Sequence, residues 1–446
     1  MGKLKGVHAP HMKNTAACEP EAIPIPKQVR LPMSMHSGAP AKPVVSVGDE
    51  VKVGQLIGEA DGRVSAPVHA SVSGKVLKID DSDPVTGTSS VSIVIESDGL
   101  QTEYDGLVAP TVTNLDEFVA AVRDSGTVGL GGAGYPTAPK FDIKDPSKFE
   151  YIIVNGAECE PYVTADTRAM IDDAALVRDG ILLMQKYLKV PNTIIGIESN
   201  KPEAIRVMQD ITADIPGVKV HTLRSLYPRG SKSMIIYETT RRIAQEGGRS
   251  ADLGVILINC STLASVARYI NTGMPLVSRC VTVDGSAVKT PKNVIAPIGT
   301  PVSELFDYCG GFKEEPKKVL LGGPMMGDAI PDLSMPIVKT TGSVLAFTAK
   351  DVKKEAETAC IRCGRCVNHC PMGLMPLEIE TAYNLKKPEL LEKYKANMCM
   401  ECGCCAYSCP AKRPLVQVIK LAKIMLRDYQ AAQKAAAQKK EAKTGE

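Results

Sequence analysis

The sequence predicts a multidomain chain of α/β and α+β type. Its 446 residues exceed what one hydrophobic core usually supports, which indicates three or more domains. Three stretches in the middle read as a strand followed by a helix, the repeating unit of an open α/β sheet. Near the C-terminus, two cysteine runs, Cys360–Cys370 and Cys399–Cys409, have the spacing of metal ligands.

Charge and hydropathy exclude several classes of function. The formal net charge is +3, and residues 411–446 carry nine Lys/Arg against three Asp/Glu, so this end holds +6 and the remainder about −3. The positive charge is therefore a local tail, and we expect no nucleic-acid partner. No run of 18 apolar residues and no secretory signal pattern occurs, so we expect neither a membrane span nor export.

The two cysteine runs are copies of one motif. Each reads C-x2-C-x2-C-x3-C-P, and each ligand position of the second run lies 39 residues after its counterpart (399 − 360, 409 − 370). In a chain that is not secreted, this clustering favours metal ligation over disulfides. Cys404 falls opposite Arg365, which is not a ligand position, and is therefore the surplus thiol of the second run.

The spacing is typical of ferredoxins with two [4Fe-4S] clusters, in which the fourth cysteine of each run binds the other cluster. A zinc ribbon would leave the third cysteine and the proline of each run unexplained. Two clusters indicate a one-electron relay. The predicted ligands are Cys360, Cys363, Cys366 and Cys409 for cluster 1, and Cys370, Cys399, Cys402 and Cys405 for cluster 2.

Residues 44–79 alternate short β-branched strands with glycine turns. They resemble the barrel-sandwich hybrid of biotinyl and lipoyl carrier domains. The expected hairpin tip, residues 60–63, ends in Arg63 and has no lysine to carry a cofactor. We therefore expect a docking or structural role for this domain.

The stretch TVGLGGAGYPTAPKF contains a glycine loop, in which Gly129, Gly131 and Gly134 satisfy G-x-G-x-x-G. A dinucleotide fingerprint of this type should open a long helix, but Pro136 and Pro139 interrupt it. A tight glycine turn is the alternative.

In each of the three strand-then-helix units, a polar residue stands at the carboxyl end of the strand. The predicted strands end at Asn155, Glu198 and Asn259. Because parallel strands place these ends along one edge of the sheet, the sequence predicts a binding crevice there. The alternative for each single residue is a cap on the next helix.

Residues 280–330 read as a small β-grasp unit: strand, turn with proline, strand, helix, strand. Met325 and Met326, in the GGPMMG turn, are expected to pack rather than bind a ligand. The isolated cysteines are expected to be buried structural thiols: Cys159, Cys260, Cys280 and Cys309.

Three motifs, GLGGAGYPT, VNGAECEP and NCST, resemble the flavin-binding core of the NADH-oxidising subunit of respiratory complex I. The β-grasp stretch resembles the SLBB module. From GVHAPHMK through LGGPMMG to the cysteine runs, residues 1–425 are similar to the RnfC family, the peripheral subunits of Rnf electron-transport complexes.

The resemblance implies a set of FMN and NAD(H) residues. Gly131, Gly132, Gly134 and Lys140 would cradle FMN and the nicotinamide. Asn155 and Glu158 would face the flavin, Glu198 would lie near the flavin or NADH, and Asn259 and Thr262 would contact the flavin phosphate or ribityl chain. The chain departs from the complex I pattern, however, at Tyr135, at Ala157, and at Cys260 and Ser261.

The resemblance also implies five segments: an N-terminal barrel-sandwich domain (1–110), a complex I flavoprotein-like FMN/NADH domain (111–275), an SLBB β-grasp domain (276–345), a ferredoxin-like helical module with two [4Fe-4S] clusters (350–425) and a basic tail (426–446). The tail begins with apolar residues on one helical face, which favours packing on the ferredoxin module; a basic handle for a partner or membrane is the alternative.

The implied function is electron transfer between ferredoxin and NAD+ coupled to Na+ or H+ translocation, on the cytoplasmic side of the cell membrane. The implied partners are NAD(H), the membrane subunits of the Rnf complex and its ferredoxin-type subunit. Two alternatives remain: a soluble flavin/iron–sulfur reductase similar to cobalamin reductases, and a non-catalytic electron-wiring subunit.

Overall fold

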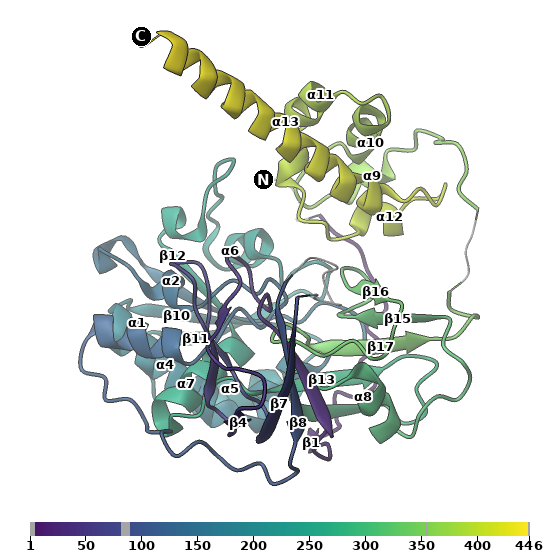
Figure 1. The fold of residues 1–446 in the computed structure, drawn as a ribbon. Coiled ribbons are helices and arrows are strands. Elements are labelled where there is room, and N and C mark those ends of the chain that lie inside the picture. The colour runs from purple at the N-terminus through teal and green to yellow at the C-terminus, as the bar shows by residue number, and fades with distance from the viewer. Residues whose placement is uncertain (1–4, 82–89, 353–355, 445–446) are drawn as a thin grey trace.

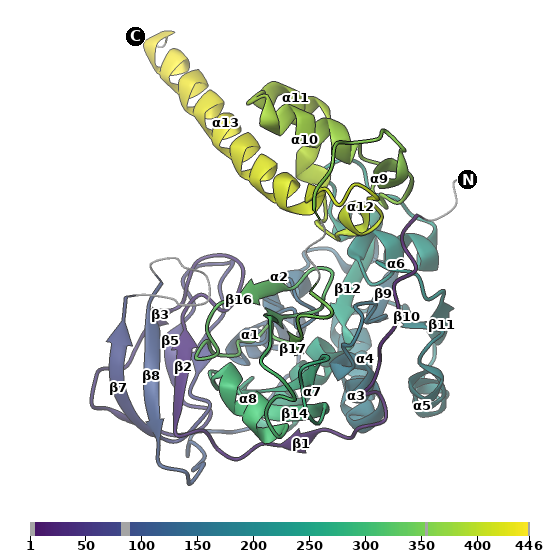
Figure 2. The same ribbon diagram turned by 90° about the vertical axis from the view of Figure 1, so that its right-hand side faces the viewer.

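The computed structural model describes residues 5–81, 90–352 and 356–444. A barrel, an α/β domain and a β-grasp sheet form the body, and a helical module sits on top of it (Figures 1 and 2). The module lies over the α/β domain near α6 (Lys232–Thr240) and away from the barrel.

The N-terminal barrel is built from two small sheets with the orders β2-β8-β7-β4 and β3-β5-β6. Alternating residues of its strands, such as Val29 and Leu31 in β2, are fully buried between the sheets. The strands are β2 (Gln28–Pro32), β3 (Lys42–Pro43), β4 (Glu50–Val51), β5 (Leu56–Glu59), β6 (Val68–His69), β7 (Gly74–Asp80) and β8 (Ser92–Ser97).

The predicted open α/β sheet is present, with four parallel strands in the order β11-β10-β9-β12. Its inner strands are continuous apolar runs because helices cover both faces. The strands are β9 (Tyr151–Gly156), β10 (Asn192–Glu198), β11 (Val218–Leu223) and β12 (Val255–Asn259). The other helices are α1 (Leu115–Asp124), α2 (Ala138–Phe141), α3 (Ala165–Asp172), α4 (Ala174–Leu188), α5 (Pro202–Thr212) and α7 (Cys260–Thr272).

The β-grasp sheet has the order β1-β14-β13-β17-β15-β16, and the predicted strand–strand–helix–strand sequence is present. An N-terminal arm, residues 5–23, crosses the α/β domain and contributes the sheet's first strand. Val7 bridges to Tyr227, and β1 pairs with β14. The elements are β1 (Glu21–Ala22), β13 (Ser278–Asp284), β14 (Lys292–Pro297), α8 (Val302–Tyr308), β15 (Lys318–Leu321), β16 (Asp328–Ile330) and β17 (Ser343–Phe347).

The helical module packs its helices around Ile379, Leu391 and Leu415. Its last helix packs on α10 and α11 through the apolar face that the sequence predicts, and then projects beyond them (Figure 1). Within the described residues, no helix combines the length and apolarity needed to cross a membrane. The helices are α9 (Arg365–Asn368), α10 (Pro376–Asn384), α11 (Pro388–Lys393), α12 (Cys404–Tyr407) and α13 (Leu415–Thr444).

Candidate functional site

The glycine loop joins the carboxyl end of β12. The Leu130 N–H donates to Thr262 Oγ1 over 2.9 Å, and Asn259 caps α7 by accepting the Thr262 N–H over 3.1 Å. A Cβ at Gly131 would lie 3.2 Å from Asn259 Nδ2, so glycine permits this close approach. Pro136 and Pro139 leave only the short α2 after the loop, as the sequence predicts.

Gly132 marks the open side of the loop. Its φ is +108°, which L side chains rarely adopt, and a Cβ built there would have no neighbour within 4 Å. The free space is what a ligand against the backbone would need. Lys140 is on α2, after the loop, with its Nζ 6.0 Å from the centre of the Tyr135 ring. Burial, and then the charge of Lys232, lower the pKa of Lys140.

Asp166, on α3, was not predicted from the sequence. Its Oδ2 accepts the Asn259 side-chain amide over 2.7 Å, and its Oδ1 accepts the Ser261 hydroxyl. This contact fixes which way the Asn259 amide points. Because Asp166 lies 93 positions from Asn259 in the sequence, no local sequence pattern could have predicted this contact.

Asn155 and Glu158 lie beyond the end of β9. The Asn155 amide donates to the Gly230 carbonyl over 2.9 Å, which ties β9 to the segment before α6. The Glu158 carboxylate accepts the Asp166 and Thr167 N–H groups at 2.6 and 3.2 Å and so caps α3. Burial raises the pKa of Glu158.

Glu198, at the end of β10, lies in a buried charged pair. Its Oε2 is 3.5 Å from Lys201 Nζ, and both side chains are almost wholly buried. Glu198 Oε1 and Asn200 Nδ2 are buried atoms that lack a hydrogen-bond partner within the described residues. Such orphaned groups fit a polar ligand at this end of the crevice.

Lys13, on the N-terminal arm, holds the segment that follows β9 through hydrogen bonds to its backbone. Its ammonium donates to the carbonyls of Glu158 and Glu160 at 2.8 Å each and to that of Val163. Burial lowers its pKa to about 8. The role of Lys13 was not predicted, because its acceptors lie about 145 to 150 positions away.

The departure at Ala157 has a packing explanation. Ala157 is fully buried in a cluster with Ile153 and Leu223, and a Cβ at Gly230 would lie 3.3 Å from its Cβ. A longer acidic side chain has no room here without rearrangement.

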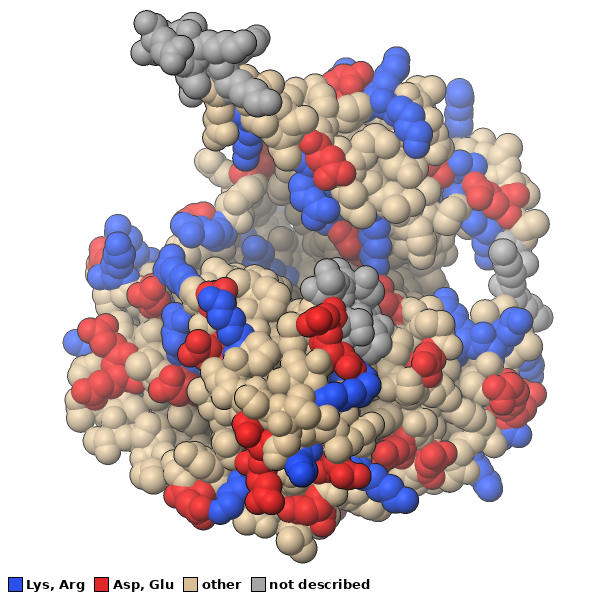
Figure 3. All heavy atoms as spheres, viewed as in Figure 1, with Lys and Arg blue, Asp and Glu red and all other residues tan. Residues whose placement is uncertain are grey.

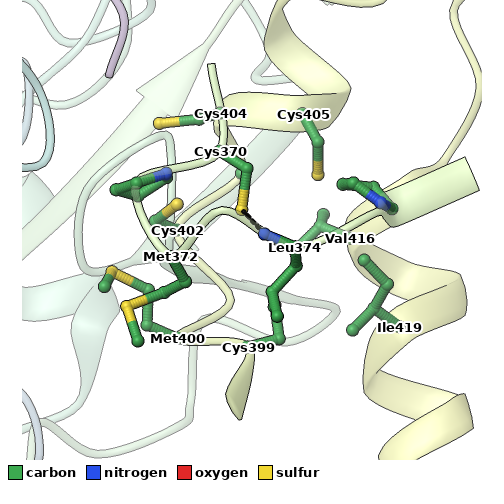
Figure 4. Close-up of a pocket in the computed structure, with 13 residues that line it drawn as sticks. Cys370, Met372, Leu374, Cys399, Met400, Cys402, Cys404, Cys405, Val416 and Ile419 are labelled. Atoms are coloured by element: carbon green, nitrogen blue, oxygen red, sulfur yellow. Dashed lines mark hydrogen bonds between the residues drawn. The ribbon is translucent and has the colours of Figure 1, made fainter. Parts of the chain in front are cut away.

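The four predicted ligands of cluster 2 line one cavity between the two cysteine runs (Figure 4). Cys370, from the first run, joins Cys399, Cys402 and Cys405, from the second. The thiols lie in apolar surroundings with Leu374 and Ile419, where burial raises the pKa of Cys399 to about 11 and that of Cys405 to about 12. Backbone N–H groups of Leu374 and Glu401 donate to the sulfurs of Cys370 and Cys399 at 3.3 Å each.

The predicted ligands of cluster 1 lie nearer the surface. Cys360 and Cys363 are exposed, and Cys366 and Cys409 are partly buried. Burial raises the pKa of Cys366, and the charge of the nearby Cys409 raises it by a smaller amount. Within the described part of the chain, no three Cys, His, Asp or Glu side chains gather around a single-ion position. A cubane instead takes one thiolate at each iron, so its ligands need not converge on a point.

Cys404 and Glu160 lie at the junction between module and body. Cys404 is fully buried and its sulfur is 3.9 Å from the Tyr227 carbonyl. Glu160 accepts the Met325 N–H at 3.0 Å and the Tyr227 hydroxyl at 3.2 Å. Met325 packs here, as predicted, whereas Met326 is 48% exposed.

Four family models match successive parts of the chain: the RnfC Barrel sandwich hybrid domain over residues 3–100, the Nuo51 FMN-binding domain over 122–268, the SLBB domain over 280–329 and the 4Fe-4S dicluster domain over 359–412. These matches confirm the predicted fold class. A distant solved structure, NAD+-reducing [NiFe]-hydrogenase in the H2-reduced state, aligns with TM-score 0.48 at 18% identity over 69% of this chain and 62% of that chain.

Three curated relatives match over most of both chains, and each is the C subunit of a redox complex. That of the proton-translocating ferredoxin:NAD(+) oxidoreductase complex of Clostridium ljungdahlii is 42% identical over 94% of this chain and 92% of its own. That of the Na(+)-translocating complex of Acetobacterium woodii is 40% identical over 94% and 95%. That of the ion-translocating oxidoreductase complex of Rhodobacter capsulatus is 39% identical over 95% and 83%. The chain therefore belongs to the RnfC family, the C subunits of ion-translocating oxidoreductase complexes.

Proposed function

We propose that this protein is the C subunit of an ion-translocating ferredoxin:NAD+ oxidoreductase and exchanges electrons with NAD(H) on the cytoplasmic side of the membrane. Its partners are the membrane subunits and the ferredoxin-type subunit of that complex. The observation that carries the proposal is that one chain holds both the glycine loop at the carboxyl end of β12 and a cavity lined by the four cysteines assigned to cluster 2, with Cys404 beside them. The body and the helical module that contain these two features are joined by a buried junction.

FMN and NAD(H) are assigned to the crevice at the carboxyl ends of β9, β10 and β12. The loop glycines let the backbone approach a ligand, and Lys140 supplies positive charge for a phosphate or a reduced flavin. Glu198 Oε1 and Asn200 Nδ2, which have no hydrogen-bond partner among the described residues, offer polar contacts at the far end. The assigned residues are Gly131, Gly132, Gly134, Lys140, Asn155, Glu158, Glu198, Asn259 and Thr262.

Two [4Fe-4S] clusters are assigned to the helical module. Cluster 1 takes Cys360, Cys363, Cys366 and Cys409, and cluster 2 takes Cys370, Cys399, Cys402 and Cys405. The shared cavity supports the second set, because it combines Cys370 with three thiols of the other cysteine run, Cys399, Cys402 and Cys405.

FMN, when bound, supplies the exchange between two-electron hydride chemistry and one-electron transfer. The residues of the chain provide the environment for it. Asp166 orients the Asn259 amide, and Asn259 in turn holds the first turn of α7 against the glycine loop. Lys13 fixes the carbonyls that precede α3, and Glu160 joins this segment to the β-grasp turn.

The test uses the full chain, reconstituted with iron, sulfide and FMN. We expect about one FMN and two cubanes per chain, and NADH should bleach the flavin absorbance at once and then the cluster absorbance. Protein that takes up iron but no FMN would instead support the electron-wiring alternative. If the protein purified from its native source carried no membrane subunits with it, the soluble reductase would be favoured.

A further inference from the structure

The helical module presents two unlike faces. One face is buried against the body: Cys404 packs on Tyr227, and a Cβ at Gly403 would come within 2.9 Å of the Met325 carbonyl oxygen. This close contact leaves no room for another protein at Gly403 and Cys404.

The loop of the first cysteine run, in contrast, is exposed to solvent. Cys360 and Cys363 are exposed, and Ile361 between them is 68% exposed (the module's place above the body is seen in Figure 3). Residues 359–371 contain two arginines and no acidic residue. The backbone of Arg362 is held in the left-handed region, φ +54°, with its N–H 3.4 Å from the sulfur of Cys360.

The two arginines, Arg362 and Arg365, are exposed cations, and no carboxylate among the described residues pairs with them. Arg362 and Arg365 make no ion pair with any residue in the described ranges, whereas some other cations of the module do, such as Lys423 with Glu401 and Lys395 with Glu246. The loop therefore combines an apolar tip with uncompensated positive charge. An apolar centre with charged residues at its rim is the ordinary anatomy of a protein interface.

We propose that the first-run loop, residues 359–369, is the docking surface for an acidic one-electron protein partner of the ferredoxin type. The proposal rests on the proposed function and adds the place and the chemistry of the contact. Arginine favours carboxylates because its guanidinium pairs with them in a bidentate manner. Complementary charge also steers a transient partner into contact.

A protein partner fits this surface better than an anionic membrane does. Polybasic membrane sites usually contain about four to eight Lys/Arg, whereas this loop contains two. The exposed thiol positions Cys360 and Cys363 lie in the same loop, so a partner docked here would be adjacent to the ligands assigned to cluster 1.

The test is a binding titration of the full, iron-loaded chain with an acidic bacterial ferredoxin that carries two [4Fe-4S] clusters. The double reversal Arg362→Glu/Arg365→Glu should weaken binding about tenfold or more at low salt and flatten its salt dependence. Arg362→Gln/Arg365→Gln should cause a smaller loss. The matched control is Arg206→Glu/Lys219→Glu, two exposed cations on α5 and β11, which should change the Kd less than twofold.

Iron content and flavin bleaching by NADH are measured on each variant. We expect both to be unchanged, so failure of the proposed function would appear as missing FMN or clusters in the unmutated chain. An unchanged Kd in the double reversal, an equal loss in the control, or no saturable binding by the unmutated chain would overturn the docking surface. Loss of binding to phosphatidylcholine–phosphatidylserine vesicles with an unchanged ferredoxin Kd would also overturn it, in favour of a membrane contact.

Discussion

Cys404 shows how a residue can share a ligand motif and serve another purpose. Its position opposite Arg365 in the repeat predicts a surplus thiol, and its side chain lies at the edge of the cavity nearest the body, against the Tyr227 carbonyl. A small, weakly polar side chain suits this buried junction.

The substitution Cys404→Ser should therefore keep both clusters, because serine is nearly as small and keeps a donor. In contrast, Cys409→Ser should remove the fourth ligand of cluster 1 and lower the iron and acid-labile sulfide content by about half. Iron analysis and low-temperature EPR of the reduced protein measure both effects. Equal iron loss in the two variants would show that the ligand set is wrong.

At the scale of elements, the glycine loop and the start of α7 form one unit, since Leu130 donates to Thr262 and Gly131 contacts Asn259. Sequence spacing could predict the loop, the strands and the cysteine motif, because each depends on neighbours a few positions away. Lys13, Asp166 and Glu160 act across 93 to 165 positions. Such contacts exist only after the domains have packed, so no local pattern encodes them.

The loop offers a matched pair of glycine substitutions. Gly132→Ala should weaken FMN binding about tenfold, because a Cβ at φ +108° is strained by about 1–3 kcal/mol and would enter the free space assigned to the ligand. Gly129→Ala is the control: its Cβ would have its nearest neighbour at 3.5 Å, an ordinary contact. Flavin fluorescence titration gives both constants. Equal retention of FMN in the two variants would place the flavin elsewhere.

At the scale of the whole molecule, buried ionisable groups connect the barrel to the rest of the body. Lys339 is 1% exposed and donates to the carbonyls of Pro67, in the barrel, and Gly126, after α1, at 2.6 and 2.7 Å. His69 lies beside it: a Cβ at Gly126 would be 3.1 Å from both His69 Nδ1 and Lys339 Nζ. Burial, and then the charge of Lys339, lower the pKa of His69 to about 3.

This arrangement predicts that acid weakens the barrel junction. Between pH 6.5 and about 3, the unfolded chain binds a proton at His69 and the folded chain does not. The free energy of unfolding therefore falls as pH falls through this range, by on the order of 3 kcal/mol at pH 4. His69→Gln removes the titrating group, so its thermal midpoint should fall less between pH 7 and pH 4 than that of the unmutated chain. The control is His221→Gln, which replaces a partly exposed histidine on β11 and should retain the full pH dependence. Identical pH profiles for all three proteins would mean that His69 is not buried in its neutral form.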